Sequence, residues 1–192
     1  TMDYLGQTGR DALKGADILK AAPEKYTSSV EYADNPIAQY MRDVVRVHTA
    51  DLGTQVFYTA HGPFDTHFNQ PPMHQKLWIE VSAAISDFFD DLHEHDAADN
   101  VIMMIFTEFG RRVRDNGTGT DHGAGGGAFI IGDRVKGGMY GTYPSLKPED
   151  LNQGDLDPSY DFRGFYSSVV DQWLGLDPVP IVGGKFEQLQ FV

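Results

Sequence analysis

Two separated stretches of the sequence carry side chains that can bind a metal ion or an anionic group. The first is GPFDTHFNQPP, in which Asp65 and His67 form a D-x-H triplet. A loop can place such a carboxylate and imidazole on the same side, and Zn²⁺ and other borderline divalent ions accept this mixture of oxygen and nitrogen ligands. The alternative interpretation is a turn capped by Asp65 or Asn69, beside an exposed His67. Two further histidines, His61 and His74, flank the triplet.

The second stretch is TEFGRRVRDNGTGTDHGAGGGAFIIG, which opens with one carboxylate and two adjacent arginines. Glu108 follows an apolar run, so its carboxylate is expected at the mouth of a strand, where it can ligate a metal or orient an arginine. Arg111 and Arg112 carry the planar guanidinium fork that suits a phosphate, sulfate or carboxylate group. The alternative is an ion pair between Glu108 and one of these arginines that closes the end of a sheet.

The same stretch continues into a glycine-rich loop that contains a single Asp-His pair, Asp121 and His122. Both are candidate metal ligands. Glycine costs more backbone entropy to order than any other residue, but it permits a close approach of the backbone and a positive φ. These properties suit either a ligand at the backbone or tight packing of strands. The alternative is a turn-forming aspartate beside an exposed histidine.

The elements that must position these groups follow from apolar periodicity. Helical spacing predicts helices over residues 8–22, 36–52, 73–92 and 161–174, with Asn35 as the N-cap and Pro36 as the first residue of the second helix. Continuous apolar or β-branched runs predict buried strands over residues 54–62, 101–107 and 127–132. The stretch RVKGGMYGTYPSL reads as a hairpin or rim loop, and the apolar C-terminal tail is expected to pack on the body.

Alternation of helices with short buried strands favours an α/β sandwich with a largely parallel sheet, formed as a single domain over residues 1–192. In such sheets the binding and catalytic residues lie in the loops beyond the carboxyl ends of the strands. The loops that begin at His61, at Glu108 and at Gly132 are therefore expected to meet at one edge.

Composition narrows the classes of partner. The chain of 192 residues has a formal net charge of −13, which argues against nucleic acid and anionic membranes as partners. The net charge does not exclude a phosphate or sulfate substrate, because an arginine pair or a metal ion can make the electrostatic potential of one pocket positive. There is no cysteine and no apolar run of membrane-spanning length. The sequence also lacks the G-x-S-x-G nucleophile motif and a P-loop.

Three segments together resemble the DUF1501 family of bacterial proteins of unknown function: LGTQVFYTAHGPFDTHFNQ, the run from FTEFGRR to GTYPSL, and DFRGFYSSVVDQWLGLDP. They occur in the order of the family, and the resemblance extends from about Pro36 to the C-terminus. Family members are typically longer and often begin with a twin-arginine export signal. The resemblance implies that this chain is the C-terminal half of such a protein and that the protein is periplasmic or secreted.

The resemblance also implies a fold and a metal site. The family is related to the alkaline phosphatase and sulfatase superfamily, a three-layer α/β/α sandwich with metal ions at the C-terminal edge of the sheet. Asp65 and His67 stand where the Asp and His ligands of one metal fall, and His122 stands where a late His ligand falls. Glu108 and Phe109 replace the Asp-His pair that usually serves a second metal. The resemblance thus favours one divalent metal ion, with zinc the best match to these ligands.

The resulting functional hypothesis is an exported, metal-dependent hydrolase that acts on phosphate or sulfate esters, either small anionic esters or phosphorylated or sulfated glycans. In this hypothesis Arg111 or Arg112, oriented by Glu108, neutralises charge on the transferred group. One alternative is a non-catalytic member that binds an anionic glycan or a partner protein. Another is a half-domain that functions only together with an N-terminal part. The substrate and the oligomeric state are left open.

Overall fold

The computed structural model describes residues 15–16 and 26–192 of the chain. The helix predicted over residues 8–22 lies outside the described residues, apart from residues 15 and 16, which are helical. The chain divides into two compact units, the first made of residues 1–65 and 72–98 and the second of residues 66–71 and 99–192. No helix in the described part of the chain combines the length and the apolar character needed to cross a membrane.

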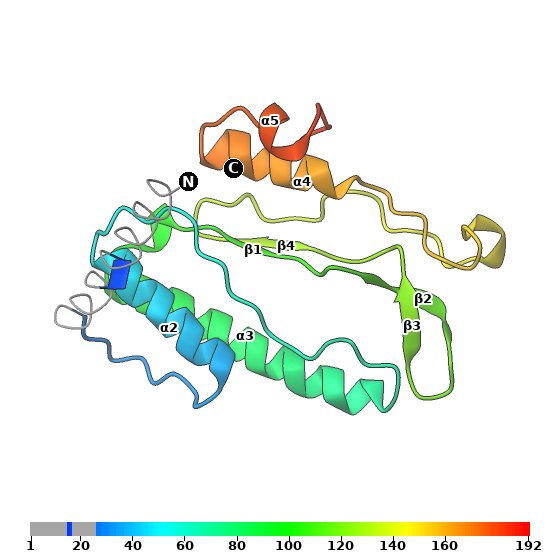
Figure 1. Ribbon diagram of the computed structural model, residues 1–192, viewed down its shortest axis with the longest axis horizontal. Helices are drawn as coiled ribbons and strands as arrows, with labels where there is room; N and C mark the ends of the chain where they lie inside the picture. The colour runs from blue at the N-terminus through cyan, green and yellow to red at the C-terminus, as the bar shows by residue number, and fades with distance from the viewer. Residues whose placement is uncertain (1–14, 17–25) are drawn as a thin grey trace, which may run out of the picture. The chain divides into compact units, whose positions relative to one another are not determined.

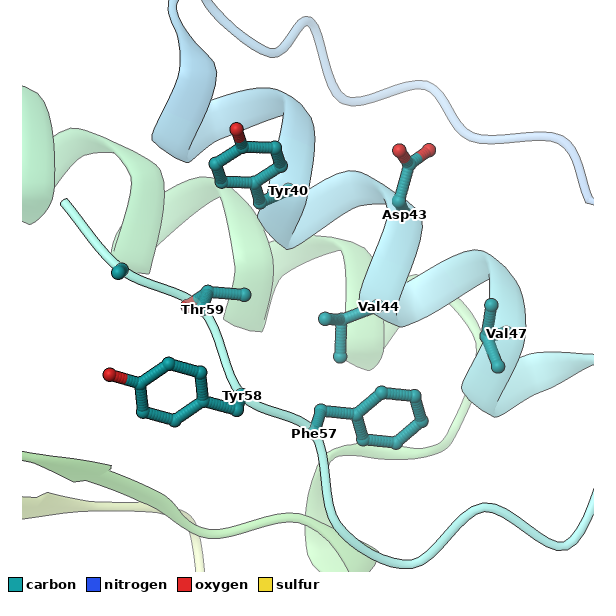
Figure 2. A pocket seen from close by; sticks show the side chains of 8 residues that line it. Tyr40, Asp43, Val44, Val47, Phe57, Tyr58 and Thr59 are labelled. Atoms are coloured by element: carbon teal, nitrogen blue, oxygen red, sulfur yellow. The ribbon is translucent and has the colours of Figure 1, made fainter. Parts of the chain in front are cut away.

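Two helices build the first unit: α2 (Pro36–Thr49) and α3 (Gln70–Glu94), the latter belonging to this unit from Pro72 onwards. They lie side by side (Figures 1 and 2). The Asn35 side chain caps α2 by accepting a 3.0 Å hydrogen bond from the backbone N–H of Ala38, and Pro36 occupies the first turn, as predicted. Both helices bury an apolar stripe, formed by Ile37, Ala38, Met41 and Val45 in α2 and by Leu77, Ala84, Phe88 and Leu92 in α3.

A fully buried carboxylate, Asp91 of α3, anchors the segment that precedes α2. The hydroxyl groups of Tyr26 and Tyr32 donate to Asp91 Oδ2 at 2.5 and 2.8 Å. The Nδ1 atom of His95 lies 2.8 Å from the Asp91 carbonyl oxygen and 3.2 Å from Oδ1. Burial and the hydrogen bond to Asp91 raise the pKa of each of these tyrosines well above the ordinary value of 10.0.

These raised pKa values predict a loss of stability in base. A group with a raised folded-state pKa contributes its full stabilisation below the unfolded pKa, here about 10, and loses it as pH rises further. We therefore expect the free energy of unfolding to begin to fall near about pH 10 and to fall further as the pH rises above it. The fall should be smaller in a Tyr26→Phe/Tyr32→Phe variant, measured by urea unfolding followed by circular dichroism. Tyr143→Phe, at a site that is 74% exposed, is the control. An equal fall in the double variant would contradict the expectation.

Residues 54–62 form no strand, so that prediction is wrong. The segment belongs to no ladder among the described residues, and all of its residues are exposed or half-buried. The prediction rested on the β-branched and aromatic residues of this segment. Such residues pack well on a pleated sheet, but they do not by themselves determine that a sheet forms. Strand composition alone does not make a ladder, and residues 54–62 belong to none that the described residues form.

The second unit contains two antiparallel, two-stranded sheets. Strand β1 (Met103–Ile105) pairs with β4 (Phe129–Ile131), with Met104 opposite Ile130. Strand β2 (Gly110–Asp115) pairs with β3 (Thr120–Gly123). Because β2 and β3 lie between β1 and β4 in the sequence, the four strands make one long hairpin, interrupted at residues 106–109 and 124–128 (Figure 1).

Helix α4 (Phe162–Ser168) continues into a π-helical turn, η4 (Val169–Trp173), and α5 (Val179–Val182) follows. This agrees with the helix predicted over residues 161–174. The C-terminal tail packs as expected, because Phe191 is 1% exposed and its carbonyl accepts a 2.8 Å hydrogen bond from the backbone N–H of Lys136. Short 3-10 turns occur at Ala98–Asn100 and Pro148–Asp150. The stretch of residues 134–146 is a loop without a strand ladder.

The expected three-layer α/β/α sandwich with a largely parallel sheet is therefore wrong. Among the described residues the strands form only the two small antiparallel sheets. The reason lies in the connection between β1 and β4. Parallel strands need a crossover of a dozen or more residues, usually a helix, whereas a hairpin reverses the chain. The segment between β1 and β4 is itself the β2–β3 hairpin, so the second strand returns antiparallel to the first.

Candidate metal centre

The β2–β3 hairpin sets the position of His122. In this hairpin Arg111 lies opposite His122, and Gly110 lies opposite Gly123. Asp115 lies opposite Thr120 at the turn, and the register shifts between Arg111 and Asp115. The turn is fixed by its own side chain, since Asn116 Oδ1 accepts the backbone N–H groups of Thr118 and Gly119. Asn-Gly at residues 116–117, with Gly117 at φ +102°, is a strong hairpin signal. The sequence interpretation treated this stretch as a loop and missed that signal.

Hydrogen bonds join the tip of this hairpin to residues 66–70, which carry His67. The backbone N–H of Gln70 donates to the Thr118 carbonyl at 3.0 Å, and the Thr120 hydroxyl donates to Gln70 Oε1 at 2.9 Å. The Asn116 side-chain amide donates to the His67 carbonyl at 3.1 Å. Two segments about fifty residues apart in the sequence are thereby held together, and this brings the two histidines to one place.

The resulting cluster consists of Asp65, His67 and His122. Each offers one ligand atom, and these atoms all lie within 4.8 Å of one another. The imidazole rings of the two histidines have their centroids 4.8 Å apart. Asp65 directly precedes Thr66, a buried residue whose carbonyl accepts a 2.8 Å hydrogen bond from Gln70 Nε2, so the local backbone holds the carboxylate near His67. All three side chains are exposed.

An aromatic ring that the sequence interpretation did not assign to the site supports His122. Phe109 stacks on the His122 imidazole, with ring centroids 3.7 Å apart and planes inclined by 14°. The Arg111 guanidinium lies over the same phenyl ring, 5.1 Å from its centroid. Phe109 therefore limits the orientations of the His122 ring. Phe109 directly precedes β2, and Arg111 of β2 pairs with His122. A hairpin predicted from the Asn-Gly turn would therefore have placed Phe109 near His122.

Replacing Phe109 with leucine should release the His122 ring. The ring current of a stacked phenyl group shifts the imidazole proton resonances upfield, so we expect those of His122 to move downfield in Phe109→Leu, toward the values of the exposed His93. Proton NMR measures this, with His122→Ala to assign the signals. Tyr143→Leu, at an exposed aromatic residue in the loop of residues 134–146, is the matched control. Unchanged His122 resonances would contradict the stacking.

Tight packing explains most of the glycine string. A Cβ atom on Gly110 would lie 1.8 Å from the Gly125 carbonyl oxygen, and one on Gly123 would lie 2.5 Å from the Arg111 carbonyl carbon. A Cβ on Gly125 would lie 2.5 Å from the Cβ of Leu156. Gly127 has no neighbour within 4 Å. The sequence left two uses open for these glycines: a ligand at the backbone or tight packing of strands. Gly110, Gly123 and Gly125 serve tight packing.

The two arginines face different sides of the hairpin. Successive residues of a strand point to opposite faces, and directly opposed residues share a face. Arg111 is opposite His122 and donates through Nη1 to the Thr120 carbonyl at 2.6 Å. Arg112 instead lies 3.5 Å from Asp155 Oδ2 through its Nη2. The structure brings Arg111 to the side of the cluster and does not bring Arg112 there.

Glu108 and Asp121 also stand apart from the three-residue cluster. Glu108 is exposed, and within the described residues it forms neither of the ion pairs with Arg111 and Arg112 that were considered. Asp121 precedes His122 in β3 and so points to the other face; its Oδ1 accepts a 3.3 Å hydrogen bond from Asn116 Nδ2. Its role here is to support the turn.

The histidines that flank the triplet have other partners. His61 Nε2 lies 3.3 Å from Glu80 Oε2, and His74 Nε2 lies 3.3 Å from the Phe64 carbonyl oxygen. Neither belongs to the cluster. A separate hollow of about 480 Å³ lies against α2 in the first unit (Figure 2). Its lining is largely apolar, with Asp43 as its one charged residue, so it does not share the chemistry of the cluster.

The donor set fits a zinc ion. Two imidazole nitrogens and one carboxylate oxygen match the three protein ligands of catalytic zinc sites, which leave a fourth position open. Ligands about 2.0–2.1 Å from a tetrahedral zinc lie about 3.4 Å from one another. The ligand atoms of Asp65, His67 and His122 lie within 4.8 Å of one another. To bind a tetrahedral zinc ion, each distance between two of these atoms must therefore shorten by at most about 1.4 Å. All three side chains are exposed, so rotation about their side-chain bonds is the movement that binding of an ion would require.

Comparison with known proteins identifies the family. A family model described as "Protein of unknown function (DUF1501)" matches residues 9–176, most of the chain. The chain belongs to the DUF1501 family. Neither a curated protein nor a solved structure matches it. The family expected from the motifs is thus confirmed. Since the description of DUF1501 assigns no activity, the chemistry of this member has to be argued from its own residues.

Proposed function

We propose that this DUF1501 protein binds one divalent metal ion, with zinc the best match, through Asp65, His67 and His122, and that it hydrolyses phosphate or sulfate esters. The observation that carries the proposal is the convergence of three ligand atoms within 4.8 Å from two distant parts of the sequence. When bound, such a metal supplies Lewis-acid polarisation of a phosphoryl or sulfuryl oxygen and activation of water.

The residues around the cluster have distinct roles in this proposal. Phe109 positions His122 by stacking, which favours one orientation of the imidazole for binding the ion. Arg111 shares the face of the hairpin with His122 and brings a positive charge to a protein of net charge −13. That charge favours an anionic substrate at this place over others on the surface. Arg111 is therefore the arginine expected to contact the phosphate or sulfate group.

Hydrolysis of generic esters tests the activity. We expect the full chain to release nitrophenol from p-nitrophenyl phosphate or p-nitrophenyl sulfate when supplied with Zn²⁺, and to lose this activity on chelation. His122→Ala should lower kcat/KM by about 100-fold or more, because a catalytic metal with only two protein ligands is poorly held. His93→Ala, which removes an exposed histidine of α3, is the matched control. Zinc-dependent turnover that survives in His122→Ala would overturn the assignment.

A second candidate function is binding of a phosphorylated or sulfated glycan without turnover. It is favoured by the exposure of all three ligand side chains, since catalytic sites usually exclude water from the reacting groups. In this case zinc and Arg111 would hold an anionic group on the surface. Zinc-dependent retention on a sulfated glycan column, lost in His122→Ala, together with no hydrolysis of either ester, would select this candidate over the hydrolase.

A further inference from the structure

The turn of the β2–β3 hairpin contains the one Asn-Gly pair of the sequence, Asn116 and Gly117. In such a pair the backbone nitrogen of the glycine can attack the side-chain carbonyl carbon of the asparagine, Cγ, and close a cyclic imide. Glycine has no Cβ atom, so no side chain shields its backbone nitrogen. The pair and all the groups that form the hydrogen bonds described below belong to the second unit. The reactive turn is therefore defined by that unit alone.

A carboxylate lies against the attacking nitrogen. The backbone N–H of Gly117 donates a 2.6 Å hydrogen bond to Asp115 Oδ1. Ring closure requires this nitrogen to lose its proton, and a carboxylate at hydrogen-bond distance is placed to accept the proton as a general base. Asp115 therefore makes the Gly117 nitrogen a better nucleophile.

Two backbone N–H groups are directed at the oxygen on which negative charge develops. Asn116 Oδ1 accepts from the N–H of Thr118 at 3.3 Å and from the N–H of Gly119 at 2.9 Å. When the Gly117 nitrogen bonds to Cγ, this oxygen becomes an oxyanion, and donors already directed at it stabilise its charge. The contacts that hold the turn thus also form an oxyanion hole.

We propose that Asn116 is a self-modification site, which the hairpin itself converts to aspartate and isoaspartate. The Gly117 nitrogen gives its proton to Asp115 and bonds to Asn116 Cγ. The bond between Cγ and Nδ2 then breaks, and Nδ2 takes up that proton and leaves as ammonia. Water next opens the imide at either carbonyl, and opening at the backbone carbonyl gives isoaspartate. No metal or oxidant takes part, so the reaction is independent of the metal centre.

The modification removes a contact that holds residues 66–70 to the hairpin. Asn116 Nδ2 donates to the His67 carbonyl at 3.1 Å and to Asp121 Oδ1 at 3.3 Å. Both products replace this donor with a carboxylate, which cannot donate and which repels Asp121. Isoaspartate also lengthens the main chain of the turn by a methylene group. The segment that carries His67 therefore separates from the hairpin as the protein ages.

Peptide mass spectrometry of aged protein tests whether the fold drives the reaction. The full chain is incubated at neutral pH, once folded and once unfolded in guanidinium chloride, and isoaspartate is detected by enzymatic methylation. We expect Asn116 to be lost at least about tenfold faster in the folded chain, because the general base and the oxyanion donors are in place only there. Equal or faster loss in the unfolded chain would show that the turn protects Asn116, which contradicts the proposal.

Asp115→Asn tests the general base. The new side chain keeps an acceptor oxygen for the Gly117 N–H but is not basic, so loss of Asn116 from the folded variant should slow by about tenfold or more. In guanidinium chloride the variant and the parent chain should react alike. Asp157→Asn, at an exposed carboxylate outside the hairpin, is the matched control and should react as the parent does. Loss of Asn116 from folded Asp115→Asn at the parent rate would rule out Asp115 as the base.

Hydrogen exchange tests the consequence for residues 66–70. The backbone N–H of Gln70 donates to the Thr118 carbonyl, so its exchange rate reports whether this segment stays on the hairpin. In modified protein, separated from the parent by ion exchange, this N–H should exchange at least about tenfold faster. The Lys136 N–H, which donates to the Phe191 carbonyl, is the control and should be unchanged. An unchanged Gln70 rate would contradict the separation of the segment from the hairpin.

Discussion

Asp91→Ala lowers the free energy of unfolding by about 3 kcal/mol, because it leaves two half-buried phenols without their acceptor, each at a cost of about 1–3 kcal/mol. Asp91 is 0% exposed and accepts from both Tyr26 and Tyr32. These bonds tie the segment before α2 to α3, so the substitution also detaches that segment. Urea unfolding followed by circular dichroism at neutral pH measures the change.

Two further variants separate this effect from a general effect of charge. Asp91→Asn keeps the shape and one acceptor oxygen, so it should cost less than Asp91→Ala. Asp90→Ala removes the neighbouring carboxylate, which is exposed, and should change the free energy of unfolding by less than about 0.5 kcal/mol. If Asp91→Ala and Asp90→Ala were equally stable, the buried acceptor would not be the anchor that the contacts indicate.

Gly110→Ala disrupts the hairpin that carries His122. The added Cβ atom would lie 1.8 Å from the Gly125 carbonyl oxygen and 2.3 Å from its carbonyl carbon, and neither backbone atom can give way without moving the strand. We expect a loss of more than about 3 kcal/mol, at the upper end of overpacking costs, and a displaced His122. Thermal unfolding measures the first effect, and the resonances of the His122 ring measure the second.

Gly127→Ala is the matched control within the same glycine string. An added Cβ atom there has no neighbour within 4 Å, and Gly127 is not among the glycines with positive φ. Its replacement should be neutral or stabilise slightly by restricting the unfolded chain. A folded, unchanged Gly110→Ala protein would show that the glycines serve something other than close packing.

The helices could be predicted from the sequence because their signals are local. Asn35 and Pro36 cap α2, and apolar periodicity marks α3 and the helix that begins after Asp161. The sheets could not be predicted in the same way, because strand pairing depends on which distant backbone lies alongside. Residues 54–62 have the composition of a strand but belong to no ladder among the described residues. Strand β1 pairs antiparallel with β4 because a hairpin, not a helix, connects them.

The candidate site was predictable only in part for the same reason. The motifs and the DUF1501 resemblance singled out Asp65, His67 and His122, and the structure places their ligand atoms within 4.8 Å. Metal binding, the substrate and export to the periplasm stay predictions. The separation of Arg111 from Arg112 follows from the twofold period of β2, which was not apparent while residues 107–126 were interpreted as a loop.

Zinc titration of the full chain tests the central claim most directly. Isothermal titration calorimetry should give one Zn²⁺ per chain, with the affinity lowered by about 100-fold or more in His67→Ala and in His122→Ala and retained in His93→Ala. Anomalous diffraction at the zinc edge should then place the ion among Asp65, His67 and His122. Absence of zinc binding, or binding that both histidine variants retain, would contradict the account.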